Sequence, residues 1–340
     1  MSELATTLWR NYWHLVCHRA ELPQPGDFIK LKVLSHEIVI FNDAGDLVAF
    51  DNRCPHRGAR IYLDDSGNQA ATCAYHGWTH SHGRMIIPNP QQFSACAIEH
   101  ARLNTWRTEW VGDFLFVGDQ PKLTIEDQLA DIRPILEDIS FGVASRVDFD
   151  SYTYECSWQI ALENALEPYH INLVHPTSLG MLDLEPGENV FTGKNSIWSA
   201  PVGSKRVNKQ LQALNRFFSL DHQYCGYQSL YVFPFAMLSS TYGFSHSLQN
   251  FFPSDEKDRA HFTSRLLKMA MKPGVDAALL DAFFDSTAKV NRQVFQEDHA
   301  ICRHVPQDTW TSEPPAFSAD SEAKLLHFRQ SCREVAAGQL

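Results

Sequence analysis

The first third of the chain alternates short apolar runs with turn residues, the pattern of a small β domain. The runs FIKLKVL and HEIVIF flank Ser35, and a turn at residues 42–45 precedes LVAF. Further along, LNTWRTEW and FLFVG flank a Gly-Asp turn at residues 112–113. Runs of this length, rich in β-branched and aromatic residues and bounded by Gly, Asn or Asp, predict strands joined by tight turns. We therefore expect strands between residues 27 and 118.

Helical spacing of apolar residues appears only in the rest of the chain. It predicts helices around residues 157–170, 277–305 and 321–336. Between the first two lies YQSLYVFPFAMLSSTYGFSHSLQNFF, whose aromatic and β-branched residues predict long strands. We expect the side chains of these strands to form the hydrophobic core. The alternative is that some of them line the substrate pocket, namely Phe235, Met237, Tyr242 and Phe244. Residues 177–205 are rich in Gly, Pro and Ser, which predicts a loop that could form a lid over a site.

Composition and charge narrow the class of protein. The chain has 340 residues, 44% of them apolar and 20% charged, which suits a globular protein of two domains. We place the boundary near residues 119–124, giving domains of 1–120 and 121–340. The net charge of −11 without a basic block disfavours nucleic acid and anionic membranes as partners. No signal-peptide pattern and no run of about 18 apolar residues occurs, so we expect a soluble cytoplasmic protein.

Two Cys/His pairs predict a metal site in the first domain. Cys54 and His56 form Cys-x-His, and 16 residues later Cys73 and His76 form Cys-x-x-His. Zinc fingers usually pair Cys with Cys and His with His, whereas here each pair mixes the two. The mixed arrangement suits a [2Fe–2S] cluster with two thiolates on one iron and two imidazoles on the other. A structural zinc site is the alternative.

These residues also carry a family resemblance. CPHRGA and CAYHGW resemble the Rieske motif, in the form found in Rieske non-haem iron oxygenases. Respiratory Rieske proteins have an additional cysteine in each loop, where this chain has Ala59 and Tyr75. The resemblance implies that Cys54, His56, Cys73 and His76 hold the cluster.

A second metal site is predicted around WQIALENALEPYHINLVH, residues 158–175. On an ideal helix His170 and His175 would point about 140° apart, so they could share a metal only if the helix were broken. Pro168 can kink the helix, and Pro176 pushes His175 out of helical geometry. Two histidines at a helix break are plausible iron ligands.

A facial triad of an Fe(II) oxygenase also needs a carboxylate. The segment QEDH at residues 296–299 offers two acids. We expect Asp298 to be the third ligand, because it interrupts an apolar stripe and a buried charge needs a partner. Glu297 is the fallback. The stripe consists of Val290, Val294, Ile301 and Val305.

The second segment strengthens the resemblance, which covers nearly the whole chain. LENALEPYHINLVHP and QEDHAICRHVPQ are similar to the iron-binding segments of these oxygenases. In the family, an acid three residues before the first iron histidine joins it to a Rieske histidine of the neighbouring subunit. That acid is usually Asp, and here it is Glu167, which resembles the carnitine monooxygenase and glycine betaine demethylase group. Asn164, on the same polar face, could bond at the iron or only cap a neighbouring group.

The resemblance implies a fold and an activity. We expect an α+β protein in which an N-terminal β-sandwich Rieske domain precedes a helix-grip, antiparallel-sheet catalytic domain. Each chain of a homotrimer would hold one [2Fe–2S] cluster and one mononuclear Fe(II) bound by His170, His175 and Asp298. With O₂ as co-substrate, it would hydroxylate or oxidatively demethylate a small organic molecule. Electrons from NAD(P)H would arrive through a flavin/iron–sulfur reductase or a ferredoxin.

Three other functions are compatible with these sequence features. The protein could be a dioxygenase that makes a cis-diol from an aromatic ring or aromatic acid. A Rieske electron-transfer protein without oxygenase activity would need no second metal site, and a zinc-stabilised binding module would need no iron. The substrate and the reductase are not evident from the sequence.

Overall fold

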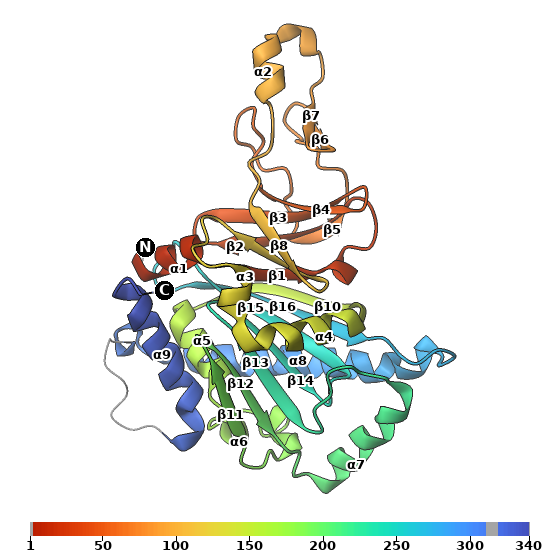
Figure 1. Cartoon of the computed structure of the whole chain (residues 1–340), viewed down its shortest axis with the longest axis vertical. Coiled ribbons are helices and arrows are strands. Elements are labelled where there is room, and N and C mark those ends of the chain that lie inside the picture. The colour runs from red at the N-terminus through yellow and green to blue at the C-terminus, as the bar shows by residue number, and fades with distance from the viewer. Residues whose placement is uncertain (1–2, 311–318, 340) are drawn as a thin grey trace.

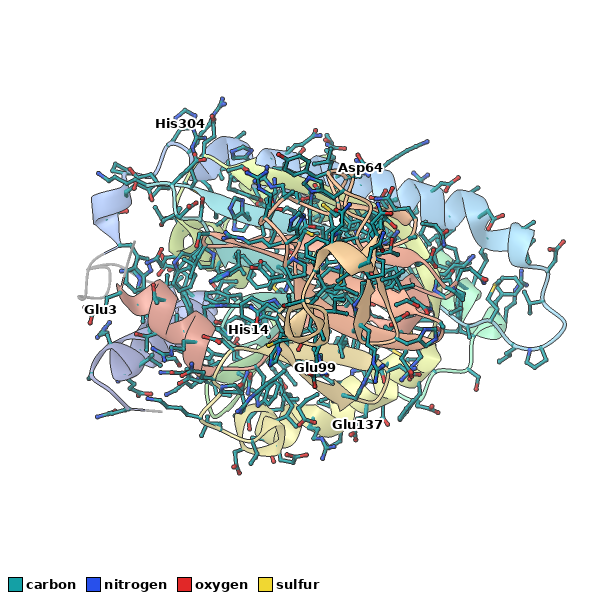
Figure 2. All side chains as sticks on the ribbon, turned by 90° about the horizontal axis from the view of Figure 1, so that it is seen from above. Glu3, His14, Asp64, Glu99, Glu137 and His304 are labelled. Carbon is teal, nitrogen blue, oxygen red and sulfur yellow. The ribbon has the colours of Figure 1, made fainter. Side chains whose placement is uncertain are left out.

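The protein has a smaller β part stacked on a larger part built around one broad sheet (Figure 1). This computed structural model describes residues 3–310 and 319–339. The chain begins in α1 (Glu3–Asn11), and both labelled ends lie on the same side of the molecule. Seen from above, Glu3 and His304 lie at the periphery of the larger part (Figure 2).

The smaller part contains two main sheets and a distal tip. One sheet has the order β4-β3-β2-β5, and the other has the order β1-β9-β8. The tip carries α2 (Ala95–His100) and the hairpin of β6 (Thr79–Ser81) and β7 (Arg84–Ile86), which point away from the larger part (Figure 1). The remaining strands are β1 (His14–His18), β2 (Asp27–Val33), β3 (His36–Asp43), β4 (Asp46–Asp51), β5 (Ser66–Asn68), β8 (Arg107–Val111) and β9 (Phe114–Gly118).

The larger part is organised by a seven-stranded antiparallel sheet. Its order is β10-β16-β15-β14-β13-β12-β11, so neighbours in the chain are mostly neighbours in the sheet. The helices α3 (Ile125–Leu129) and α4 (Arg133–Gly142) lead from the smaller part into the first strand. The strands are β10 (Val143–Tyr154), β11 (Glu188–Thr192), β12 (Asn195–Ala200), β13 (Tyr227–Val232), β14 (Ala236–Thr241), β15 (Ser245–Pro253) and β16 (Ala260–Met269).

Helices cover this sheet and carry the candidate site. The longest of them, α8 (Asp281–Cys302), runs behind the sheet in Figure 1 and packs against β10 and α5 (Trp158–Leu166). The short α6 (Ile171–Val174) follows α5 and contacts α8. The last helix, α9 (Ala323–Ala336), packs against α5 and α1, while α7 (Lys205–Leu214) lies at the opposite end of the sheet (Figure 1).

The predicted fold class is confirmed, but one predicted segment is wrong. Residues 177–205 contain the hairpin of β11 and β12 instead of forming only a loop. Thr192 pairs with Asn195, so Gly193 and Lys194 form a two-residue turn, and Gly193 has a φ of +54°. Glycine adopts this left-handed backbone without steric cost. The glycines and prolines that suggested a loop therefore flank and join the strands of a hairpin at the edge of the sheet.

The two parts share buried contacts. Arg265 on β16 is fully buried and donates to the carbonyl oxygen of Val16 on β1 at 2.8 Å and to Oδ1 of Asn250 at 2.7 Å. Glu21 supplies the opposite charge at 3.7 Å. A buried guanidinium that bonds groups of both parts holds the sheet of β1, β9 and β8 against the larger sheet. The boundary between residues 1–120 and 121–340 stays a prediction.

A helix that crosses a membrane must be long and predominantly apolar. Within residues 3–310 and 319–339, no helix combines the length and the apolar character needed to cross a membrane.

Candidate metal centres

The break after α5 brings two histidines together. Helix α5 ends at Leu166, and Glu167 then adopts an extended backbone with φ −104° and ψ 131°. After Pro168 the chain re-enters a short helix capped by His170, and His175 ends that helix immediately before Pro176. As a result, the Nε2 atoms of His170 and His175 lie 3.2 Å apart. The helix break expected from the two prolines is therefore present.

Asp298 on α8 completes a group of three donors. Its Oδ1 lies 3.0 Å from Nε2 of His175 and 3.4 Å from Nε2 of His170. Each of these residues offers one donor atom, and the three atoms all lie within 4.8 Å of one another. Two imidazoles and one carboxylate form the donor set of mononuclear non-haem Fe(II) sites. Glu297, the fallback, does not reach this point.

The apolar stripe that suggested Asp298 is nevertheless wrong. Val290, Ile301 and Val305 are exposed, and the buried residues of α8 are Phe284, Phe295, Asp298 and Cys302. On a helical projection the buried face is centred about 80° from the stripe that the sequence suggested. Asp298 lies at the shared edge of both faces, so its burial was predicted correctly from an incorrect stripe.

Each of the three donors has a second partner that fixes its orientation. Nδ1 of His170 lies 2.6 Å from Oε1 of Glu167, and Nδ1 of His175 lies 2.7 Å from Oε2 of Glu297. Asn164 donates its amide to Oδ1 of Asp298 at 2.7 Å. Carboxylates behind ligating imidazoles fix the ring tautomer and leave Nε2 free for a metal. The contact of Glu297 with His175 was not predicted from the sequence. The one sequence feature that pointed to it was the pair of adjacent acids in QEDH.

Charge at this point favours a cation. Burial would lower the pKa of His170, but hydrogen bonds with Asp298 and Glu167 outweigh it and raise the pKa to about 9. Burial would likewise raise the pKa of Asp298, yet its bonds to His170 and His175 lower it to about 2. Asp298 is thus held ionised beside two imidazoles, a combination that suits a bound cation.

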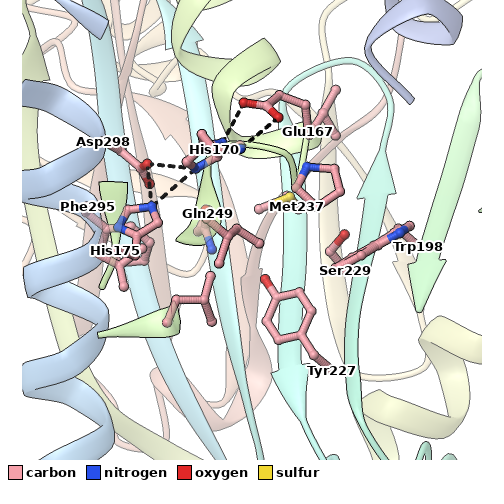
Figure 3. A pocket seen from close by; sticks show the side chains of 16 residues that line it. Glu167, His170, His175, Trp198, Tyr227, Ser229, Met237, Gln249, Phe295 and Asp298 are labelled. Carbon is pink, nitrogen blue, oxygen red and sulfur yellow. Dashed lines mark hydrogen bonds and ion pairs between the residues drawn. The ribbon is translucent and has the colours of Figure 1, made fainter. Parts of the chain in front are cut away.

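A cavity of about 50 Å³ adjoins the three donors. Its wall opposite them comes from one face of the sheet, where β12, β13, β14 and β15 contribute alternate side chains (Figure 3). These are Trp198, Tyr227, Ser229, Met237 and Gln249. Of the aromatic-rich set considered from the sequence, only Met237 lines this cavity, and Phe235, Tyr242 and Phe244 lie in the core.

The two Cys/His pairs of the smaller part form matching loops. In the first, Cys54 N–H donates to the Ala59 carbonyl at 2.9 Å, and Gly58 N–H donates to the Cys54 carbonyl at 2.8 Å. The second repeats this pattern, since Cys73 N–H donates to Trp78 and Gly77 N–H donates to Cys73. Gly58 and Gly77 have φ of +73° and +72°, which only glycine adopts readily. The repeated geometry places the equivalent residues of both loops face to face.

Facing donors of the two loops meet. Nδ1 of His56 lies 3.2 Å from Nδ1 of His76, while the side chains of Cys54 and Cys73 contact each other. Burial, followed by the neighbouring Cys73 thiol, raises the pKa of Cys54. Both cysteines are buried and His76 is exposed. The indole of Trp78 stacks on His56 with an interplanar angle of 6°. Two thiols inside and two imidazoles outside fit a Rieske cluster.

Comparison with known proteins agrees with this class of two-centre protein. A model of the Rieske [2Fe-2S] domain matches residues 12–104, and a model of the ring hydroxylating alpha subunit (catalytic domain) matches residues 141–338. The second match alone covers more than half of the chain. The chain therefore belongs to the ring-hydroxylating alpha-subunit family of Rieske non-haem iron oxygenases.

Several characterised relatives match part of the chain. The carnitine monooxygenase oxygenase subunit of Acinetobacter pittii is 28% identical over 211 residues, which are 60% of this chain and 56% of that protein. The anthranilate 1,2-dioxygenase large subunit of Acinetobacter baylyi is 27% identical over 49% of this chain and 38% of its own length. The matches thus span about half or less of the length of these relatives. They support membership of the family and do not identify a substrate.

Solved structures extend the likeness to the whole fold. A quaternary ammonium Rieske monooxygenase superposes with a TM-score of 0.74 at 20% identity, covering 98% of this chain and 90% of that one. Naphthalene 1,2-dioxygenase from Rhodococcus sp. superposes with a TM-score of 0.70 at 16% identity, covering 97% and 91%. At these identities the likeness concerns the fold.

Proposed function

We propose that this chain is the oxygenase component of a Rieske non-haem iron system. It uses O₂ and electrons from a reductase to hydroxylate or oxidatively demethylate a small organic molecule. The observation that carries the proposal is the convergence of His170, His175 and Asp298 beside a cavity. A pure electron-transfer protein would have no use for a second donor set of this kind.

The donor sets fit two resident groups per chain. Cys54, Cys73, His56 and His76 would hold one [2Fe–2S] cluster, with its imidazole side toward solvent. His170, His175 and Asp298 would hold one Fe(II). When bound, the cluster supplies single electrons and the mononuclear iron supplies the redox chemistry that activates O₂. Zinc suits the first set less well, because each loop mixes one thiol with one imidazole.

The surrounding residues position these donors. Glu167 accepts from Nδ1 of His170, and its other oxygen accepts the backbone N–H of Tyr169 at 2.6 Å. Glu297 accepts from His175 and is itself held by Ser178 at 2.6 Å. Asn164 restrains Asp298. Cavity walls of Trp198, Tyr227 and Met237 limit access of water to the reacting face.

Electron transfer between subunits is part of the proposal. The cluster loops lie by the distal tip beside β6 and β7, whereas α6 and its histidines lie near the far end of the larger part (Figure 1). Each end exposes large apolar side chains. Leu63 and Tyr75 are exposed near the cluster loops, and Tyr169 and Leu173 flank His170. Head-to-tail contacts between such patches close into a ring, which we propose is a homotrimer.

In this ring, Glu167 would join His170 to His76 of the next subunit. A carboxylate accepts a hydrogen bond from an imidazole on each side and so orients both rings. One solved relative is described as revealing inter-subunit electron transfer. NAD(P)H would supply the electrons through a flavin/iron–sulfur reductase or a ferredoxin.

Product analysis tests the proposed function. The iron-loaded protein would be supplied with NADH, a surrogate reductase and ¹⁸O₂, together with a panel of alkylamines and aromatic acids. We expect mass spectrometry to find a hydroxylated or demethylated product, with ¹⁸O in the product or in released formaldehyde. Asp298→Ala should form none while retaining the visible spectrum of the cluster. A cis-diol would instead identify an aromatic dioxygenase, and a protein that accepts electrons but oxygenates nothing would be an electron carrier.

A further inference from the structure

Among the residues that the structure describes, Lys324 on α9 is a buried cation that has no carboxylate partner. Its side chain is 1% exposed, and Nζ donates to Oγ of Ser229 at 2.9 Å and to the Ser229 carbonyl oxygen at 3.1 Å. The other buried cations in residues 3–310 and 319–339 each face a carboxylate. These pairs are Lys30 with Asp65, Arg265 with Glu21, and Arg329 with Glu163. An ammonium in an apolar interior is costly unless an opposite charge accompanies it.

Ser229 connects this cation to the candidate iron site. It lies on β13, opposite Trp198 on β12, and lines the cavity beside His170, His175 and Asp298 (Figure 3). Because Oγ of Ser229 accepts from Lys324, its own proton is available for another acceptor. Within the described parts of the chain no residue accepts that proton. The hydroxyl is therefore a donor strengthened by the charge behind it and free to serve the cavity.

We propose that Ser229, with Lys324 bonded behind it, forms an anion-binding site at the wall of the cavity, and that the substrate carries a carboxylate bound there. This inference rests on the proposed oxygenase function for its claim that the occupant is a substrate. A carboxylate oxygen in the cavity would accept the Ser229 hydroxyl and bring the missing negative charge close to Lys324. Charge-assisted bonds of this kind are stronger than those between neutral groups.

The rest of the lining agrees with this assignment. Burial lowers the pKa of Lys324 to about 7, as expected for an ammonium that no opposite charge accompanies. A bound anion would reverse this effect. Trp198 and Tyr227, with ring centroids 5.8 Å apart, offer surface for the uncharged or aromatic remainder of such a molecule. A substrate with only a positive charge would be repelled by the ammonium.

Calorimetric binding of matched probes tests the inference without turnover. Two acids would be compared with their amides on the iron-loaded protein: 3-methylbenzoate with 3-methylbenzamide, and glycine betaine with glycine betaine amide. Within a pair only the anionic group differs. We expect at least one acid to bind about tenfold or more tightly than its amide, the size of one charge-assisted hydrogen bond.

Variants locate the preference. Lys324→Met should remove it, and Ser229→Ala, which keeps the lysine, should reduce it toward equality. Lys194→Met is the matched control, because Lys194 is also held to α9, at 2.7 Å from Glu334, but its bonded partner does not line the cavity. It should keep the full preference. Retained iron content and an unchanged cluster spectrum would show that each variant is folded.

Several results would overturn the inference. These are equal binding of acid and amide in both pairs, binding of neither acid, or an unchanged preference in Ser229→Ala and Lys324→Met. Oxygenation of neutral compounds without acid preference would reject the anion-binding site and keep the proposed function. Acid binding at Ser229 without oxygenation of any compound would support the anion-binding site and reject the proposed oxygenase function.

Discussion

Glu297 and Asp298 are consecutive residues of α8, yet they contact opposite edges of one imidazole ring. Glu297 lies 2.7 Å from Nδ1 of His175, whereas Asp298 lies 3.0 Å from Nε2. A metal ligand must be on the Nε2 side, where His170 also lies. The geometry therefore separates a candidate ligand from the carboxylate that orients the ring.

Iron content should distinguish these two acids. Asp298→Ala removes one of three donors and should abolish binding of the mononuclear iron, leaving about two irons per chain. Glu297→Ala only frees the His175 ring and should weaken iron binding by about 10–100-fold. Metal analysis after dialysis against graded chelator measures both, with the visible spectrum as a check on the cluster. If Glu297→Ala lost the iron and Asp298→Ala retained it, the ligand assignment would be reversed.

The cluster ligands can be tested through the reduction potential. The purified protein should be red-brown, with the EPR signal of a nitrogen-ligated [2Fe–2S] cluster after reduction. Replacing one imidazole by a thiolate in His76→Cys adds negative charge and should lower the potential by more than about 100 mV. His82→Cys is the control, since His82 lies in the nearby exposed turn and outside both loops. A colourless protein with stoichiometric zinc would rule out the Rieske cluster.

Glu167 should matter for electron delivery rather than for assembly. Glu167→Gln keeps the size of the side chain but loses its charge and one acceptor. We expect normal cluster, iron and oligomer, with slower reoxidation of the reduced cluster in single turnover with substrate and O₂. Glu155→Gln is the control, because Glu155 pairs with Arg259 on the surface at 3.2 Å. Wild-type reoxidation rates in Glu167→Gln would remove it from the electron path.

Exposed apolar residues beside His170 should control the assembly. Leu173 is 86% exposed in α6, and a charge there would be buried if this face docks on a second copy. Leu173→Glu should therefore give monomers by light scattering, with both metal centres filled but without electron transfer between them. Leu279→Glu adds the same charge at another exposed leucine and should leave the oligomer intact. A fully active monomer would contradict the proposed ring.

Acid should destabilise the fold through buried histidines. Burial lowers the pKa of both His14 and His246 to about 3, from 6.5 in the unfolded chain. The stability that these neutral histidines contribute to the native state is therefore fully present above pH 6.5. It is lost as the pH falls toward 3, because the unfolded chain binds protons that the native state cannot. Between pH 7 and pH 5 each should cost about 2 kcal/mol of unfolding free energy.

Urea unfolding at the two pH values measures this loss. His246→Leu should make it smaller by about 2 kcal/mol, since one such histidine is gone. His304→Leu, at an exposed position, should leave it unchanged. An equal loss in wild type and His246→Leu would show that His246 takes up its proton without unfolding.

Features whose parts lie close together in the chain could be predicted from the amino-acid sequence. Each Cys/His pair of the smaller part belongs to one tight loop, Cys54 with His56 and Cys73 with His76. The spacing within each pair is therefore enough to predict a common metal site. The break between α5 and α6 follows from Pro168 and Pro176, because proline disrupts helical backbone locally. Strand and helix patterns also sufficed for a small β domain followed by an α+β domain, whereas the antiparallel catalytic sheet was expected from the family resemblance.

Contacts between groups that are distant in the chain depend on how the helices and the sheet pack, and could not be predicted in this way. His175 and Asp298 are 123 residues apart, and the rotation of α8 that turns Asp298 inward depends on packing of Phe295 and Cys302, which local periodicity misjudged. Ser229 and Lys324 are 95 residues apart, the first in a segment predicted as strands and the second in a predicted helix. Their contact exists because α9 docks on the sheet, and the energy of docking comes from many side chains rather than from either residue.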